Sequence, residues 1–174
     1  LWDIGDKNKA RERFLDLYSM EAMAQDVLYN LGFLELEMDN TEAGINFLTL
    51  YIENDSEDIE ARKALGDAYM EQELYGKAVE MYNTVLEKSK DEPTVHFKKA
   101  FILLSAIGES KAGLEALEKA IDAGFSDKKR LLALVHHPNL LNADEVKTLL
   151  IEKEVLTEED IVSYPPVEEQ KPPL

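Results

Sequence analysis

The sequence contains three histidines, a residue type that can transfer protons or bind metal ions. His136 and His137 are adjacent, and neighbouring side chains of a helix point about 100° apart, so one metal ion could not easily take both. They precede Pro138, where a helix should end, and a histidine there interacts favourably with the helix dipole. His96 falls where a helical pattern faces its neighbour. We therefore expect the three histidines to have structural roles.

Other signals of catalysis are missing from the sequence. There is no cysteine, which removes thiolate nucleophiles, thiolate metal sites and disulfides together. Neither a glycine-rich phosphate loop nor a HExxH spacing occurs. Asp and Glu are abundant, but they are scattered over expected helix surfaces, where such residues usually meet water. We therefore expect a protein that is not an enzyme and that uses no cofactor or metal.

The charge of the chain narrows the choice of partners. The 174 residues hold 36 Asp and Glu against 19 Lys and Arg, a formal charge of −17, which repels nucleic-acid phosphates and anionic lipid. No apolar run approaches the roughly 18 residues that span a bilayer, and the first twenty residues carry charges throughout, unlike a secretory signal. We expect no nucleic-acid binding and no direct membrane insertion. The compartment stays open, with the cytoplasm favoured.

A pattern with a period of 34 residues organises the chain up to about residue 125. Each unit has an apolar-periodic helix, a polar break, and a second helix with a small residue four positions before a large apolar one. The small residues should lie where two helices cross closely, and the large ones should fill the space between units. The second helices carry the pairs Ala10 and Phe14, Gly44 and Leu48, Ala78 and Tyr82, and Gly113 and Leu117, and the first helices carry Gly32, Gly66 and Ala100.

This helix–turn–helix unit resembles the tetratricopeptide repeat. The resemblance implies an all-α fold, a right-handed α-solenoid with about seven repeat helices, two or three C-terminal capping helices and no sheet. The expected parts are a partial repeat in 1–24, repeats in 25–58 and 59–92, a repeat-like unit in 93–125, capping helices in 126–163, and a proline-rich extended tail in 164–174. Exposed ends of repeat arrays need such a polar-faced closing element.

Several departures from the family pattern carry information. Only residues 59–92 match it closely, and its tryptophan is replaced by Leu28, Arg62 and His96. One extra residue near Ile107 and Gly108 predicts a locally distorted turn. In the terminal segment, helix starts are expected at three capping residues: Ser126, Asn142 with Glu145, and Thr157.

The repeat register also bears on the start of the chain. Run backwards, it places the first unit's start about nine residues before Leu1, so we expect a piece of a longer array. Leu1 and Trp2 would end a helix whose beginning is absent. Phe14, Leu17 and Trp2 would then lack a covering helix, which predicts self-association through this edge.

In tetratricopeptide proteins the first helix of each unit lines a concave groove for peptides or partner helices, and the resemblance implies the same here. Some of these side chains could instead turn inward and pack between units. A clamp for acidic chaperone tails is disfavoured, because Lys98 is the only base at the corresponding places. The expected groove residues are Tyr29, Phe33, Leu36, Lys63, Met70, Phe97 and Phe101.

Acidic residues are concentrated in one repeat. Residues 25–58 hold nine acids and no Lys or Arg, whereas residues 93–126 balance four against four. This favours a hydrophobic or amphipathic partner with a basic flank, unless the acids only keep the array soluble. The sequence thus predicts a non-catalytic scaffold that binds a partner peptide or helix. The alternative is a regulatory or targeting segment of a larger enzyme or cell-envelope protein.

Overall fold

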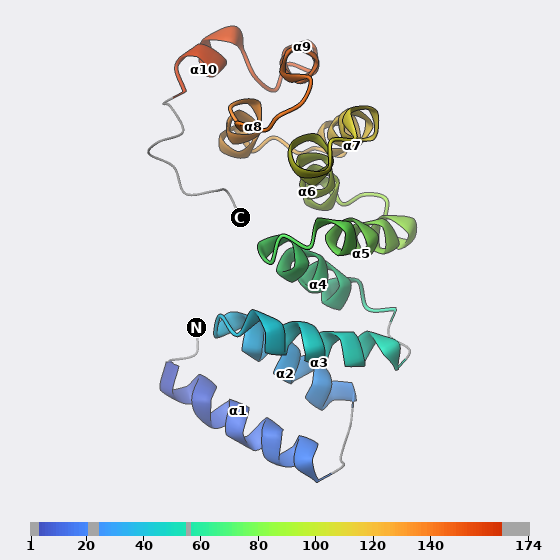
Figure 1. Cartoon of the computed structure of the whole chain (residues 1–174), viewed down its shortest axis with the longest axis vertical. Helices are drawn as coiled ribbons and strands as arrows, with labels where there is room; N and C mark the ends of the chain where they lie inside the picture. Colours follow the sequence, from blue (N-terminus) through green and yellow to red (C-terminus); the bar gives the residue numbers. More distant parts are fainter. Residues whose placement is uncertain (1–3, 21–24, 55–56, 165–174) are drawn as a thin grey trace. The chain divides into compact units, whose positions relative to one another are not determined.

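The computed structural model describes residues 4–20, 25–54 and 57–164. Within these residues the fold is all-helical, without a strand, as predicted (Figure 1). In this described part of the chain, seven helices are followed by three more, which agrees with the expected number. They are α1 (Ile4–Ser19), α2 (Gln25–Glu37), α3 (Thr41–Glu53), α4 (Ile59–Glu71), α5 (Tyr75–Lys88), α6 (Pro93–Ile102), α7 (Ser110–Asp122), α8 (Lys128–Val135), α9 (Ala143–Glu152) and α10 (Glu158–Val162).

The chain divides into two compact units, Leu1–Met81 and Tyr82–Leu174, with the division inside α5. In the first unit, α2 and α3 form a hairpin whose helices cross at two glycines. A Cβ atom on Gly44 would lie 2.5 Å from Leu36 Cδ2 and 3.1 Å from the Gly32 carbonyl oxygen. A Cβ atom on Gly32 would lie 2.5 Å from Leu48 Cδ2. The prediction that small residues allow this close crossing is confirmed here.

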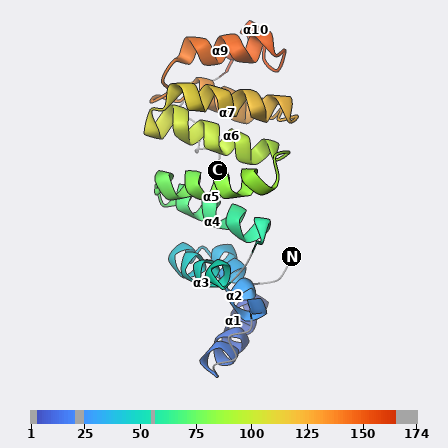
Figure 2. The same cartoon turned by 90° about the vertical axis from the view of Figure 1, so that its right-hand side faces the viewer.

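The second unit is centred on the hairpin of α6 and α7, which lie side by side (Figures 1 and 2). Gly113 again permits the crossing, because a Cβ atom there would lie 2.6 Å from Leu104 Cγ. Leu117 is fully buried, and the same core continues into the terminal helices through Leu131 and Leu150. The terminal helices therefore close one side of this hydrophobic core, the task expected of a cap.

The extra residue of the third unit is absorbed by a π-helical turn, η1 (Leu103–Ile107). It ends at Gly108, whose φ of 87° lies in the left-handed region that glycine adopts without strain. The amides of Gly108 and Glu109 both donate to the Leu103 carbonyl, at 3.0 and 2.9 Å. The Leu104 carbonyl instead accepts the Leu141 amide at 3.1 Å. The predicted distortion is confirmed, and it holds the loop before α9.

The starts of the terminal helices agree only in part with the sequence. Thr157 caps α10 in a complete capping box with Asp160, as expected. The N-cap of α8 is Asp127 rather than Ser126, because its carboxylate accepts the Arg130 amide at 3.1 Å. The expected box at α9 is wrong. Asn142 is left-handed there, with φ of 56°, and its side chain bonds the Glu145 carboxylate rather than a helix amide.

Candidate functional site

An aromatic cluster lies on α2, at two of the expected groove positions. Tyr29 and Phe33 are one helical turn apart, and their ring centroids are 4.6 Å apart. Tyr29 also meets the edge of Tyr51 on α3 at 5.2 Å, and all three rings are half-buried. Burial, with a smaller effect of the Asp58 carboxylate, raises the pKa of Tyr29 above 10.0. Its phenol therefore stays neutral and can donate a hydrogen bond.

Two further expected groove residues lie on α4, which contacts α2 within the same unit. Lys63 and Met70 are both half-buried. The Lys63 Nζ atom lies 2.9 Å from Glu60 Oε1, and the charge of Glu60 also reaches Tyr29. The first unit therefore combines aromatic rings with a paired lysine and carboxylate close to Tyr29. Such a surface offers a partner both an apolar anchor and polar edges.

Leu36, an expected groove residue, instead turns inward and packs between helices. Its Cδ2 and Cγ atoms lie 2.5 and 2.6 Å from the position that a Cβ atom on Gly44 would take. The side chain therefore fills the space over that glycine and packs α2 onto α3. Its main role in the structure is packing within the hairpin.

The two phenylalanines of α6 do not form an open aromatic wall. Phe97 is 3% exposed and stacks on Phe125 at a centroid distance of 4.2 Å, so it belongs to the core. Phe101 is half-buried, and His137 covers it edge-on at 5.2 Å. The reason is tertiary: Phe125 follows α7 and His137 follows α8, and both contacts are remote in sequence. The prediction that Phe97 is an accessible groove residue is therefore wrong, because Phe97 is a core residue.

The acidic surface of residues 25–58 is also smaller than the count of acids implies. Glu35 is fully buried, and its Oε1 atom lies 2.6 Å from the Arg11 Nε atom on α1. Lys7 lies 3.0 Å from Glu37, so α1 neutralises two acids of α2. Glu35 lies on the same face of α2 as the buried Leu28 and Leu31. This helical spacing is the feature of the sequence that could have predicted its burial.

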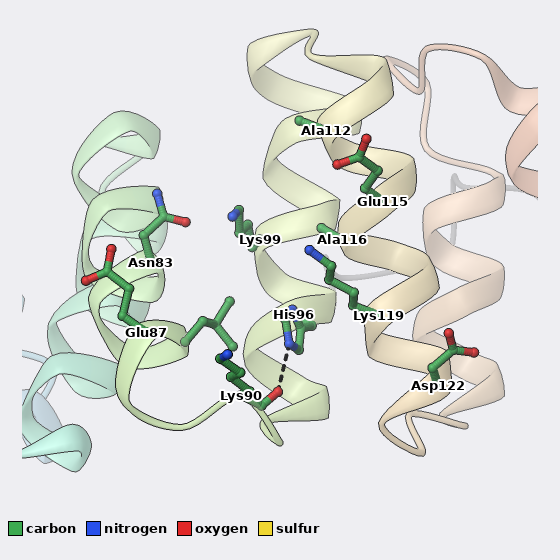
Figure 3. A pocket seen from close by; sticks show the side chains of 11 residues that line it. Asn83, Glu87, Lys90, His96, Lys99, Ala112, Glu115, Ala116, Lys119 and Asp122 are labelled. Carbon is green, nitrogen blue, oxygen red and sulfur yellow. Dashed lines mark hydrogen bonds between the residues drawn. The ribbon is translucent and has the colours of Figure 1, made fainter.

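A cavity that the sequence did not reveal lies in the second unit, between the end of α5 and the α6–α7 hairpin. Its volume is about 660 Å³, and Figure 3 shows its lining side chains. His96 anchors one side, because its Nε2 atom donates to the Lys90 carbonyl oxygen at 3.0 Å. The residues that line it are Asn83, Leu86, Glu87, Lys90, His96, Lys99, Ala112, Glu115, Ala116, Lys119 and Asp122.

The two adjacent histidines have separate partners. The His136 Nε2 atom donates to the Ile161 carbonyl oxygen at 3.0 Å, and its ring stacks on Tyr164. His137 meets Phe101. Among the residues that the structure describes, no group of three or more His, Asp or Glu is placed to hold a metal ion. No helix in the same part of the chain is long and apolar enough to cross a membrane.

Together these features define a helical-repeat protein. Solved structures of MamA have a similar fold. One crystal structure of MamA has a TM-score of 0.69 and 17% identity, covering 94% of this chain and 99% of that one. MamA AMB-1 has a TM-score of 0.70 and 18% identity, with coverages of 88% and 90%. MamA MSR-1 has a TM-score of 0.66 and 19% identity, with coverages of 86% and 90%. No family model and no curated protein matches the chain.

Proposed function

We propose that this chain is a non-catalytic scaffold of the tetratricopeptide type that binds a hydrophobic or amphipathic peptide or helix. The observation that carries the proposal is the half-buried pair of Tyr29 and Phe33, with Glu60 and its partner Lys63 on α4 close to Tyr29. Rings in such a place have an apolar face for a partner side chain and charged neighbours for its main chain. The fold shared with the MamA structures supports the repeat architecture.

The rings should supply most of the affinity. Burying an aromatic ring is worth about 1.5–3 kcal/mol, whereas an exposed charge pair contributes at most about 1 kcal/mol. Asp26, Asp39 and Glu42 are exposed and can steer a basic flank of the partner. Glu35 takes no part in steering, because Arg11 holds it in the interior.

Selection from a displayed peptide library on the immobilised chain tests this function. Peptides that bind the natural chain should lose about tenfold or more in affinity for Phe33→Ala, since one buried ring is removed from the interface. Leu50→Ala is the control, because Leu50 is an exposed apolar residue on α3. Peptides that bind Phe33→Ala as well as they bind the natural chain would place the partner site elsewhere. Circular dichroism of each variant checks that the fold is kept.

Self-association is a second candidate, favoured by exposed apolar side chains on α1. Leu17 is 43% exposed and Met20, directly after the helix, is 75% exposed, while Phe14 is half-buried. Trp2, which was expected to share this edge, lies outside the described residues. Exposed apolar side chains on a repeat helix are a usual place for a neighbouring unit or another copy to pack.

A further inference from the structure

Two lysines in the cavity of the second unit lack a carboxylate partner within the described residues. Lys99 comes from α6 and Lys119 from α7, and Figure 3 shows both side chains on the side of the hairpin that faces α5. The positive charge of Lys119 is close enough to act on Lys99, and Lys99 is half-buried. Two ammonium groups are therefore held near one another at a partly desolvated site.

The acid nearest in sequence to Lys119 on this side is already engaged. Asp122 lines the cavity, but its Oδ1 atom lies 2.8 Å from Lys153 Nζ, which also binds Glu118 at 3.0 Å. Lys153 thus neutralises α7 acids from the side of the terminal helices. The remaining lining acids, Glu87 and Glu115, form no ion pair with either lysine in the described part of the chain.

Electrostatics makes an anion the natural occupant of this place. Burial, and then the like charge of Lys119, lower the pKa of Lys99 below 10.5, although the Glu109 carboxylate opposes them in part. A carboxylate between the two ammonium groups would offset both effects, because an opposite charge favours the charged form of lysine. The acids that matter for this contact are those of the lining itself, where Glu87, Glu115 and Asp122 lie beside Lys90, Lys99 and Lys119. Because Asp122 is paired with Lys153, the lining holds three lysines against two other acids, and this local balance favours an anion.

We propose that this cavity binds an extended acidic peptide, with a Glu or Asp carboxylate placed between Lys99 and Lys119. A volume of about 660 Å³ is far larger than one carboxylate needs and is typical of a site for a larger ligand, at about 300–1,000 Å³. Asn83 can both donate to and accept from a peptide unit. Leu86 and Ala116 add apolar surface to the lining, which can contact the aliphatic part of a peptide side chain. The cavity shares no residue with the aromatic cluster of α2, so this proposal can be tested independently of the proposed function.

Nuclear magnetic resonance titration tests the proposal, with acetyl-Ala-Glu-Ala-Glu-Ala-amide as the probe. The expected result is saturable shifts of amides in α5, α6 and α7, and a rise in the pKa of Lys99 read from its side-chain carbon. Lys99→Gln and Lys119→Gln should each weaken binding about five- to tenfold, the effect of losing one partly buried charge contact. Lys111→Gln is the matched control, since Lys111 is exposed on α7 outside this cavity.

Three comparisons distinguish the outcomes. The same peptide with Gln in place of Glu should bind at least tenfold more weakly, and equal binding would overturn the role of the carboxylate. Glutarate and inorganic phosphate supply the charge without a peptide chain. If either binds as tightly as the acidic peptide, the site is a general anion site and the peptide proposal is wrong. Absence of shifts in the cavity at saturating peptide would overturn it as well.

Discussion

Arg11 and Glu35 join the first helix to the second through an ion pair whose carboxylate is closed to solvent. Arg11 Nε lies 2.6 Å from Glu35 Oε1, and the other carboxylate oxygen accepts the Asn40 side-chain amide at 2.8 Å. The arginine side chain remains 38% exposed, whereas the carboxylate side chain is 0% exposed. The contact spans 24 residues of sequence and fixes α1 against the α2–α3 hairpin.

Arg11→Met should destabilise the first unit, because it leaves a buried carboxylate without its positive partner. Breaking a buried pair costs about 3–5 kcal/mol, and the partial exposure of Arg11 places the expected loss at or below the lower end. Urea unfolding measures it. Arg11→Met combined with Glu35→Leu is the control, and it should recover most of the loss because no buried charge remains. Equal losses in the single and double variants would contradict this account.

Gly44→Ala should destabilise the chain, whereas Gly76→Ala should not. A new Cβ atom at Gly44 would meet Leu36 at 2.5 Å, and overpacking of this kind costs about 1–3 kcal/mol. A Cβ atom at Gly76, in the first turn of α5, would meet nothing within 4 Å beyond its own turn of the helix, and alanine should stabilise by up to about 1 kcal/mol. Thermal unfolding of both variants checks the opposite signs. A loss of stability in both would show that helix crossing is not the deciding factor.

Phe97→Ala and Phe33→Ala should separate stability from binding. Phe97 is stacked in the core, so its truncation should cost about 3–5 kcal/mol of unfolding free energy. Phe33 is half-buried, so its truncation should cost only about 1 kcal/mol while it weakens peptide binding. Urea unfolding and peptide affinity, measured on both variants, test this. The interpretation is wrong if Phe33→Ala unfolds as readily as Phe97→Ala.

His137 should make stability depend on pH. Burial lowers its pKa below 6.5 in the folded chain, and its Nδ1 atom accepts the Asn139 amide at 3.3 Å, which requires a neutral nitrogen. Between the folded pKa and about 6.5 the unfolded chain binds more protons, so the unfolding free energy falls as the pH falls through this window. Below the folded pKa this contribution levels off. His137→Phe, which keeps a ring against Phe101, should flatten that part of the curve. An unchanged slope would assign the dependence to another group.

Leu17→Gln with Met20→Gln should reduce self-association if α1 carries the contact. These two apolar side chains are exposed at the end of α1, so a polar replacement removes their drive to leave water. Sedimentation velocity over a range of concentrations measures the effect. The control is Leu74→Gln, which changes an exposed leucine just before α5. If that control lowers association as much, the effect does not depend on α1.

The fold could be predicted from the sequence because repeats make it local. The period of 34 residues placed Gly44 and Gly113 at helix crossings, and each crossing involves helices adjacent in the chain. The extra residue near Ile107 appeared as a slip in that period, and the structure turns it into a π-helical turn. Patterns of this kind need no knowledge of distant contacts.

The candidate site was harder to predict because side-chain burial depends on distant residues. Phe97 and Phe101 are four residues apart on one helix, yet Phe97 stacks on Phe125 and is buried, whereas Phe101 meets His137 in a T-shaped contact and is only half-buried. Periodicity assigns a residue to a face, but it does not tell what covers that face. The cavity with Lys99 and Lys119 depends on where three helices meet, which no spacing in one helix indicates.

The π-helical turn also has a consequence for how such an array could lengthen. Its widened backbone frees the Leu104 carbonyl, which the Leu141 amide then occupies. A further repeat packed on the third unit could not use this carbonyl, because the Leu141 amide already donates to it. A duplication of one repeat after residue 125 would separate Leu141 from that carbonyl and leave a buried acceptor unmatched. We therefore expect relatives of different length to gain or lose their units upstream of α6.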